Sequence, residues 1–488
     1  MAATLTQRTI SGMIWSSVQR FGTLGISFIS SLILARLLTP EDYGAIGVLA
    51  IFIALSNTFI DGGFGSALVQ KKNPTQDDYS SIFYWNILLA VVLYGLLYWC
   101  APAISVFYKM PILAEVLRIQ GIILIINALQ IIQNNQLNKQ LRFKPLSLIT
   151  ISAALLSVIA GIILAYRGYG VWSLVVQQLI NSAVCAVLLW IYNKWYPSLT
   201  FNWKSFKELF NFGGFMLLSN LLTTLCNNIQ GLIIGRVFST RDMGFYAKAR
   251  SLEEIPSMSI SNIVNQVTFP VFSELQEDKE KLKNALSHIV TALAFVCFPL
   301  MILLIVIAKP LIIILFSDRW TESIPYFQIL CIAGIAISLQ GINYNVVAAI
   351  GKSKILFKWT IIKRVIGIGC IFIGLPFGMK GLLWGMVGGS YAIYLINAFV
   401  ASKYIGYSSK NQFTDIFPIL LLSAGVGIIT WFFGTHLPVN FRIAGLIQVL
   451  LFGFLYLTLA FFIKCKSFTI SIATLKRMMI KAKHERNK

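Results

Sequence analysis

Charged side chains inside long apolar segments are the residues of this sequence that are best suited to do chemistry. Five basic residues lie in such segments: Arg20, Lys248, Arg250, Lys363 and Arg364. An ionisable group at membrane depth is costly, so it normally faces the protein interior or water and finds a partner there. These five cations are therefore candidates to line a cleft and to bind an anionic substrate.

Three acidic residues in or beside the same segments are candidates for binding a coupling ion: Asp61, Glu253 and Glu254. At about 1.5 Å per helical residue, Arg20 and Asp61 would lie about 15 Å and about 12 Å from the same membrane face, so they could meet. Asp61 could then hold Arg20 until a substrate or cation arrives. A purely structural ion pair is the alternative.

Glu253 and Glu254 follow Arg250 closely in one segment. Arg250 and Glu254 are spaced i,i+4, and Arg250 and Glu253 are spaced i,i+3, so at least one pair can share a helical face. One carboxylate is then left without an obvious partner, and Pro256 opens the helical hydrogen-bond ladder just beyond it. This pattern favours a proton or sodium site, although a neutralised structural cluster fits it equally well.

Lys363 and Arg364 allow two interpretations. Trp359 could mark the membrane interface, and both side chains would then extend to the membrane surface. This position at the surface is favoured over the alternative, in which both side chains line a basic cleft. Two polar runs, Asn127 to Gln136 and Asn227 to Gln230, could similarly hydrogen-bond the hydroxyls of a substrate, but bonds between helices are the commoner role of such residues.

The elements that position these residues are membrane helices. Of 488 residues, 57% are hydrophobic and only 12% are charged, whereas soluble proteins have about 25% charged residues. Each membrane helix needs about 20 mostly apolar residues. We predict an all-α polytopic membrane protein with about 14 transmembrane helices, at 10–38, 43–69, 80–106, 112–134, 146–166, 170–192, 209–238, 243–272, 285–316, 325–349, 355–377, 379–405, 415–434 and 440–463.

Metal and disulfide chemistry are not expected. The seven cysteines lie mostly inside apolar runs without a CxxC pair, and there are only three histidines. These residues supply neither the ligands of a zinc site nor a disulfide framework. We expect no catalytic residue, no metal and no cofactor apart from a coupling H⁺ or Na⁺.

The net charge of +22 is explained by where the basic residues lie. If the N-terminus is cytoplasmic, the inner segments hold more than twice as many Lys and Arg as the outer loops, which is the usual bias of membrane proteins. Both termini are therefore predicted to be cytoplasmic, and nucleic acid is not needed to explain the charge. Two amphipathic stretches, Trp203 to Phe210 and Phe468 to Met479, are expected at the inner membrane surface.

The sequence contains an internal repeat. A displacement of 200 residues aligns 32–44 with 232–244 and matches Arg36 with Arg236, Asp42 with Asp242 and Gly44 with Gly244. Because six predicted spans separate the copies, both halves should enter the membrane in the same direction. We predict pseudo-symmetric six-helix lobes at 1–200 (spans 1–6) and 201–410 (spans 7–12), two further spans at 411–465, and a basic cytoplasmic amphipathic tail at 466–488.

The repeat also carries a family resemblance. The run from Leu34 to Gly44, followed by Asp61 to Gln70, resembles the opening of the polysaccharide-exporter, or Wzx-type flippase, family. Phe245 to Arg250 and Phe269 to Ser273 resemble the second-lobe signature of its colanic-acid-exporter-like branch. The resemblance covers the chain up to about residue 465 and implies the multidrug/oligosaccharidyl-lipid/polysaccharide exporter superfamily.

The resemblance implies a transporter rather than an enzyme. It would move an undecaprenyl-diphosphate-linked oligosaccharide, such as an O-antigen, exopolysaccharide or capsule repeat unit, to the periplasmic leaflet of a bacterial inner membrane by alternating access. Polysaccharide assembly proteins are possible partners. The alternatives are a lipid II flippase, a cation-coupled drug exporter of the same superfamily and, less favoured because the outer loops are short, a polysaccharide polymerase or ligase.

Overall fold

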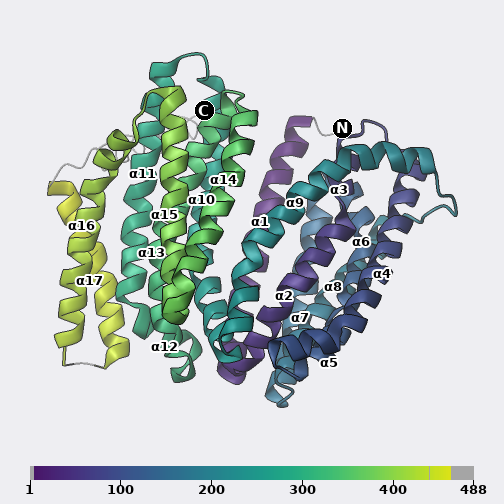
Figure 1. Ribbon diagram of the computed structural model, residues 1–488, viewed down its shortest axis with the longest axis horizontal. Coiled ribbons are helices and arrows are strands. Elements are labelled where there is room, and N and C mark those ends of the chain that lie inside the picture. The colour runs from purple at the N-terminus through teal and green to yellow at the C-terminus, as the bar shows by residue number, and fades with distance from the viewer. Residues whose placement is uncertain (1–4, 439, 463–488) are drawn as a thin grey trace, which may run out of the picture. The chain divides into compact units, whose positions relative to one another are not determined.

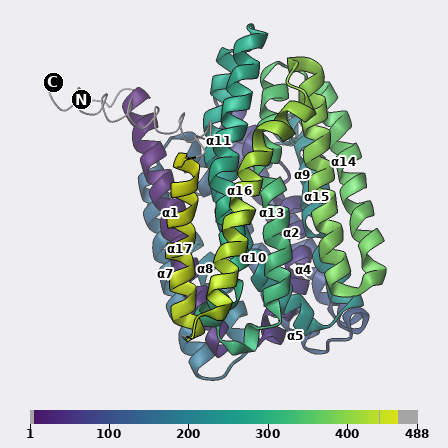
Figure 2. The ribbon, with the colours of Figure 1, turned by 90° about the vertical axis from the view of Figure 1, so that its left-hand side faces the viewer.

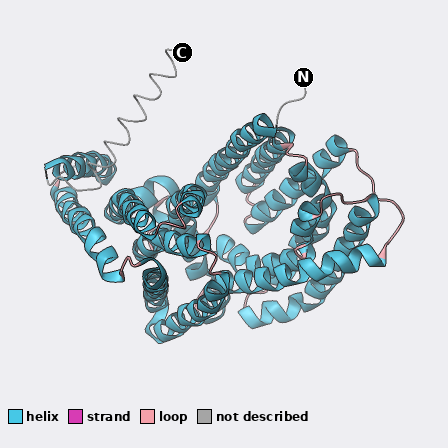
Figure 3. Cartoon of the chain, turned by 90° about the horizontal axis from the view of Figure 1, so that it is seen from above, coloured by secondary structure: helices cyan, strands magenta, loops and turns pink. Residues whose placement is uncertain are grey.

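The computed structural model describes residues 5–438 and 440–462, and these contain helices but no strand (Figure 3). The prediction of an all-α membrane protein is confirmed. The predicted basic tail, 466–488, lies outside the described residues. The chain forms two compact units, Met1–Gly244 and Phe245–Lys488. The predicted lobe boundary at residue 200 rests on the sequence repeat and stays a prediction.

The first unit contains nine helices in its described residues and the first turn of a tenth (Figure 1). They are α1 (Leu5–Leu37), α2 (Pro40–Asp61), α3 (Phe64–Gln70), α4 (Gln76–Tyr108), α5 (Ile112–Gln120), α6 (Ile122–Lys139), α7 (Phe143–Tyr166), α8 (Val171–Asn193) and α9 (Trp203–Val237), followed by the start of α10 (Thr240–Glu274). α1 packs on α7, and α9 packs on α2 and α4.

The second unit holds the rest of α10 and the remaining elements up to Phe462. They are α11 (Lys279–Val306), α12 (Ala308–Phe316), η1 (Asp318–Trp320), α13 (Ser323–Ala349), α14 (Ser353–Gly374), η2 (Leu375–Phe377), α15 (Gly378–Ile405), α16 (Ser409–His436) and α17 (Phe441–Phe462). α13 packs on α15 and α15 packs on α14 (Figure 2), and α16 packs on both α11 and α17.

Local sequence explains where several helices begin and end. At the start of α2, the Thr39 side chain accepts a hydrogen bond from the Asp42 backbone N–H, and the Asp42 carboxylate accepts one from the Thr39 backbone. This reciprocal capping box satisfies two amides that a helix start leaves unpaired. The predicted run 43–69 is broken between α2 and α3, because Gly62 and Gly63 adopt φ of 57° and 73°, which favour glycine.

Twelve described segments are long and apolar enough to cross a membrane, so the predicted count of about 14 is not confirmed. One of the twelve, 355–405, contains both α14 and α15. α10 is absent from the twelve because no part of it is apolar enough. Its first half carries Arg241, Asp242, Lys248, Arg250, Glu253 and Glu254, and residues 255–272 have no charge but several Ser, Asn, Gln and Pro residues. The charges that make α10 a candidate site also lower its hydropathy.

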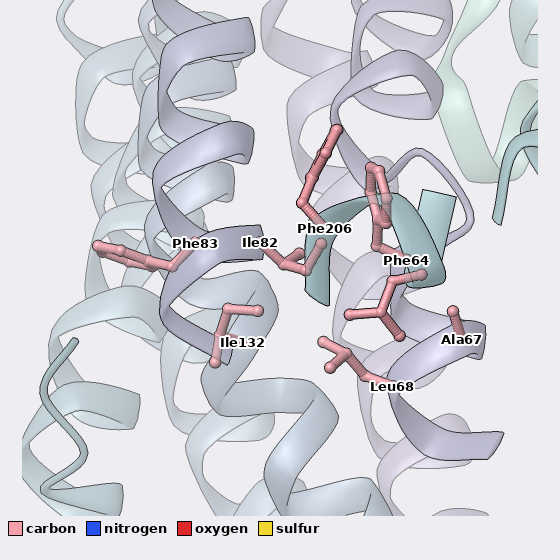
Figure 4. Packing of buried hydrophobic residues seen from close by; sticks show 8 residues of the cluster. Phe64, Ala67, Leu68, Ile82, Phe83, Ile132 and Phe206 are labelled. Carbon is pink, nitrogen blue, oxygen red and sulfur yellow. The ribbon is translucent and has the colours of Figure 1, made fainter. Parts of the chain in front are cut away.

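The start of α9 is packed in protein. Phe206 and Leu209 are 6% and 4% exposed and join a cluster with Phe64 and Leu68 of α3 and Ile82 of α4 (Figure 4). The prediction that this amphipathic stretch lies on the membrane surface is wrong for these two side chains. A helical spacing of apolar residues is expected both for a helix on a membrane surface and for a helix whose apolar face packs against neighbouring helices.

Candidate functional site

The predicted ion pair in α10 is present. The Arg250 Nε donates to the Glu254 Oε1 at 2.7 Å, and the Arg250 Nη1 donates to the Tyr246 hydroxyl at 3.0 Å. All three residues are spaced four apart, so they lie along one face of the helix. The Arg250 and Glu254 side chains keep 31% and 38% of their area exposed. Arg250 is therefore oriented by two neighbours and remains partly accessible.

Glu253 lies in a different environment from Glu254. Its residue exposure is 3%, and among the groups that the structure describes its Oε1 has no hydrogen-bond partner. The carboxylate lies against the backbone of α13, where a Cβ added to Gly334 would overlap the Glu253 Oε1. The sequence left one of the two carboxylates without an obvious partner, and in the described residues it is Glu253 whose Oε1 is unpaired.

Lys248 is 4% exposed and faces aromatic rings. Its Nζ lies 5.0 Å from the ring centroid of Phe316 and 5.8 Å from that of Trp320, on α12 and η1. Such cation–π contacts stabilise a buried ammonium group. Lys248 therefore helps to fasten α10 to these elements, and its predicted role as a substrate ligand stays a prediction.

Lys363 points into the second unit. Its Nζ donates to the Asn397 Oδ1 of α15 at 2.8 Å and lies 5.4 Å from the Tyr344 ring centroid of α13, and the residue is 8% exposed. The interpretation that Lys363 extends to the membrane surface is wrong, because Asn397 offers it a partner inside the bundle. Arg364 is half-buried, and its role as a cleft cation stays a prediction.

Arg20 and Asp61 do not pair. Neither residue occurs in an ion pair within the described part of the chain, and Arg20 is exposed. The physical reason is the packing of α1, which lies along α7: Gln19 beside Arg20 donates to the Thr150 hydroxyl at 3.3 Å. Asp61 is half-buried at the end of α2, beside Gly65 of α3.

Several polar residues of the predicted runs join helices. The Asn127 Nδ2 of α6 donates to the Asn57 Oδ1 of α2 at 3.0 Å, and the Asn193 Nδ2 of α8 donates to the Gln136 Oε1 of α6 at 2.6 Å. Hydrogen bonding between helices, which was the favoured interpretation, is therefore present at these positions. Asn228 donates to the Thr224 carbonyl within α9.

Sequence reasoning missed an ion-pair cluster at the predicted inner face. The Lys71 Nζ lies 3.1 Å from the Asp78 Oδ1 at the start of α4 and 3.2 Å from the Glu208 Oε2 of α9. Burial disfavours the charged form of Lys71, but the hydrogen bonds and charges of the two carboxylates outweigh it and raise the pKa of the lysine. The only sign of this cluster in the sequence is the pair of acidic residues, Asp77 and Asp78, that follows Thr75.

Sequence reasoning also missed a buried amide pair. The Asn343 Nδ2 of α13 donates to the Gln412 Oε1 of α16 at 3.1 Å, and the Gln412 Nε2 donates back to the Asn343 Oδ1 at 3.0 Å. Both residues are fully buried. The only signal in the sequence is that both segments carry amide residues among apolar ones, which is too common to predict a pair.

A family model described as "Polysaccharide biosynthesis protein" matches residues 33–325, which is more than half of the sequence and includes both copies of the repeat. The chain belongs to the polysaccharide biosynthesis protein family. The predicted membership in the polysaccharide exporters is thereby confirmed.

Three relatives match this chain over most of its length. The chain is 28% identical over 431 residues to the teichuronic acid biosynthesis protein TuaB of Bacillus subtilis, covering 88% of this chain and 89% of that protein. It is 24% identical to the lipopolysaccharide biosynthesis protein WzxC of Escherichia coli, covering 87% and 89%. It is 23% identical to the succinoglycan biosynthesis transport protein ExoT of Rhizobium meliloti, covering 90% of each.

The fold of this family member occurs in a solved structure. The lipid II flippase MurJ, in an inward closed conformation, superposes with a TM-score of 0.77 at 18% identity, covering 93% of this chain and 99% of that one. This likeness shows that the two chains share a fold. The chain is thus a multispanning membrane protein of the polysaccharide biosynthesis protein family, and one of its relatives, ExoT, is named a transport protein.

Proposed function

We propose that this protein is a flippase that moves a diphosphate-linked lipid oligosaccharide from the cytoplasmic to the periplasmic leaflet of a bacterial inner membrane. The carrier lipid would be undecaprenyl diphosphate, and the cargo would be one repeat unit of a surface polysaccharide. The observation that carries the proposal is the family match in a chain with the fold of a lipid flippase. Polysaccharide assembly proteins that receive the flipped unit are further proposed partners, and membrane lipids surround the carrier tail.

The buried cations would compensate the charge of the diphosphate. A charged head group cannot cross hydrocarbon alone, and a guanidinium binds phosphate oxygens through paired hydrogen bonds. Arg250 is the strongest candidate, because its side chain is oriented by Glu254 and Tyr246 yet remains partly exposed. Arg20, Lys248, Lys363 and Arg364 are further candidates, and Lys363 is already held by Asn397.

Glu253 is the proposed coupling site for H⁺ or Na⁺, with Asp61 and Glu254 as further candidates. A charge buried without a partner is costly, so the Glu253 carboxyl needs a bound proton or cation to be neutral. Its unpaired Oε1 against the backbone of α13 supports this role. Glu254 differs because Arg250 already neutralises it. Binding and release at Glu253 would couple an ion gradient to transport by alternating access.

A deletion strain tests the proposed function. Without the gene, lipid-linked repeat units should accumulate on the cytoplasmic leaflet, and a plasmid copy should restore their export. Accumulation of unpolymerised units on the outer leaflet would instead indicate a polymerase or ligase. Rescue of a strain that lacks its lipid II flippase, together with normal export of the surface polysaccharide, would assign the protein to lipid II transport.

A further inference from the structure

Polar side chains follow the contact between α2 and α6, two helices of the first unit. The Asn127 Nδ2 of α6 donates to the Asn57 Oδ1 of α2 at 3.0 Å, and the Gln130 Nε2 donates to the Asn127 Oδ1 at 2.9 Å. Asp61 follows Asn57 at the i,i+4 spacing, so the two lie on one face of α2. Together with Asn135 of α6, these four residues form what we call the polar seam.

Asp61 and Asn135 of the polar seam meet beside Gly65 of α3. A Cβ added to Gly65 would be 3.1 Å from the Asp61 Oδ1 and 3.1 Å from both the Oδ1 and the Nδ2 of Asn135. The carboxylate and the amide therefore border the same point, and a residue without a side chain leaves them room there. The turn at Gly62 and Gly63 places α3 at this position.

The polar seam has hydrogen-bonding groups that its neighbours do not use. Among the described residues, the Gln130 Oε1 and the Asn135 Nδ2 are buried atoms without a hydrogen-bond partner, and Asp61 forms no ion pair. A buried polar atom that stays unpaired costs free energy, so a ligand or a water is expected to supply the partner. All five residues are half-buried, so a rotation of the side-chain amide brings the unpaired atom to the surface.

The internal repeat shows which positions of the two halves are equivalent. At the start of α2, Thr39 and Asp42 cap each other, and at the start of α10, the Ser239 hydroxyl accepts from the Asp242 N–H while the Asp242 carboxylate accepts from the Ser239 backbone. The sequence repeat is therefore also a repeat of local structure. Residues that lie 200 positions apart can be compared for what the fold requires.

The fold does not require amides at the α6 positions of the polar seam. The displacement of 200 residues aligns the three amides of α6 with Phe327, Leu330 and Ile335 of α13. These three residues are apolar and buried in the second unit. A helix at this place in the fold therefore packs well with apolar side chains, so the amides of α6 favour a role in binding.

We propose that the polar seam binds sugar hydroxyls of the lipid-linked oligosaccharide. This inference rests on the proposed flippase function, and it assigns the glycan to the first unit and Asp61 to that glycan. A side-chain amide both donates and accepts hydrogen bonds, and a carboxylate accepts at two oxygens. A sugar hydroxyl likewise donates one hydrogen bond and accepts others, so neighbouring hydroxyls of a sugar ring match the unpaired donor of Asn135 and the acceptors of Asp61 and Gln130.

The chemistry of the polar seam fits a sugar better than it fits an ion. The unpaired atom of Asn135 is a donor, which suits a hydroxyl oxygen and does not suit a metal cation. The seam contains one carboxylate and neither Lys nor Arg, so it would repel a diphosphate. A site that hydrogen-bonds a hydroxyl strongly rejects ligands that lack it. The seam would therefore make transport depend on the glycan as well as on the diphosphate.

Binding of the free oligosaccharide tests the inference without transport. The probe is the water-soluble repeat unit that mild acid releases from the lipid-linked oligosaccharide of the same strain, and the protein is the full chain in detergent. Calorimetry should show binding to the wild-type protein and about tenfold weaker binding to Asn135→Leu, because an apolar side chain leaves a sugar hydroxyl unpaired. Gln19→Leu is the matched control and should keep the wild-type affinity, because Gln19 is a half-buried amide of the same unit that already donates to Thr150.

Three results of this titration would overturn the inference: no binding to the wild-type protein, equal affinity of Asn135→Leu and the wild type, or equal weakening by Gln19→Leu. Thermal unfolding in detergent checks that each variant is folded. If Asn135→Leu does not fold, Gly65→Ala decides instead, because its methyl group would press on Asp61 and Asn135 while both polar groups remain. Gly65→Ala should also weaken binding, and wild-type affinity would contradict the proposal.

Variants of Asp61 distinguish a sugar from a cation. Asp61→Asn keeps the shape and the ability to bond a hydroxyl but loses the charge, whereas Asp61→Leu loses both. We expect oligosaccharide binding to weaken by less than about threefold in Asp61→Asn and by about tenfold in Asp61→Leu. If Asp61→Asn instead abolished the response of transport to an ion gradient, with wild-type oligosaccharide binding in both variants, Asp61 would be an ion site and the assignment would be wrong.

Transport kinetics separate binding by the polar seam from a structural role. In proteoliposomes, Asn135→Leu should raise the concentration of lipid-linked oligosaccharide at half-maximal rate about tenfold and leave the maximal rate nearly unchanged. A lower maximal rate at an unchanged half-saturating concentration would indicate a structural role and contradict the proposal. If the wild-type protein moves no lipid, the proposed function fails, and the binding measurements still decide whether the seam binds sugar.

Discussion

At the scale of single residues, adjacent carboxylates in α10 have opposite environments. Glu254 is paired with Arg250, whereas Glu253 is buried and its Oε1 has no hydrogen-bond partner in the described part of the chain. The i,i+4 spacing predicted the Arg250–Glu254 pair correctly because that geometry is local to one helix. It could not predict Asn397 as the partner of Lys363, because that contact depends on how α14 and α15 pack.

Replacement of Glu253 should uncouple transport from the ion gradient. Glu253→Gln keeps the shape of the side chain but cannot bind or release a proton or bind a cation as a carboxylate does. We expect transport in proteoliposomes to become independent of an imposed proton or sodium gradient. Glu254→Gln changes the second candidate carboxylate, and it should retain the dependence because Arg250 already neutralises Glu254. A gradient response that persists in Glu253→Gln would remove this residue from the coupling site.

Arg250→Lys should impair transport, because a lysine ammonium cannot reproduce the fork of a guanidinium. We expect at least a tenfold loss of transport at an equal amount of folded protein in the membrane. Lys358→Met, an exposed position in α14, serves as a control for the general effect of losing a positive charge. Wild-type transport by Arg250→Lys would exclude a role for the guanidinium in diphosphate binding.

At the scale of the elements, α9 shows what amphipathic periodicity can and cannot predict. The spacing of Trp203, Phe206 and Leu209 predicted a helix with one apolar face. It could not tell whether that face lies on a membrane surface or packs against other helices. The neighbour is α3, which exists as a separate helix because the chain turns at Gly62 and Gly63. The sequence did not reveal this turn, because both glycines lie inside the run 43–69, which was predicted to be one continuous span.

Phe206→Ala should destabilise the first unit, because it removes a buried ring from the cluster with Phe64 and Ile82. Large-to-small changes of this type cost about 3 kcal/mol. Thermal unfolding in detergent would measure the loss. Trp203→Ala on the same helix should have a much smaller effect, because Trp203 is 64% exposed. Equal destabilisation by both changes would indicate that the whole stretch is packed.

At the scale of the whole molecule, composition was sufficient to predict a helical membrane protein, and the repeat was sufficient to predict internal duplication of the helix starts at Thr39 and Ser239. The number of spans was harder to predict, because α10 combines helical length with seven charged residues. The boundary of the compact units after Gly244 was not predictable from the repeat, since packing of α9 on α2 is a tertiary property.

The most direct test of the account is to measure lipid transport by the purified protein in liposomes. A fluorescent lipid-linked oligosaccharide diphosphate would be placed in the inner and outer leaflets, and a membrane-impermeant quencher would report the fraction that crosses. The account predicts rapid exchange between leaflets with the wild-type protein and a loss of at least tenfold with Arg250→Lys. Exchange no faster than in protein-free liposomes, with folded protein and an imposed ion gradient, would contradict it.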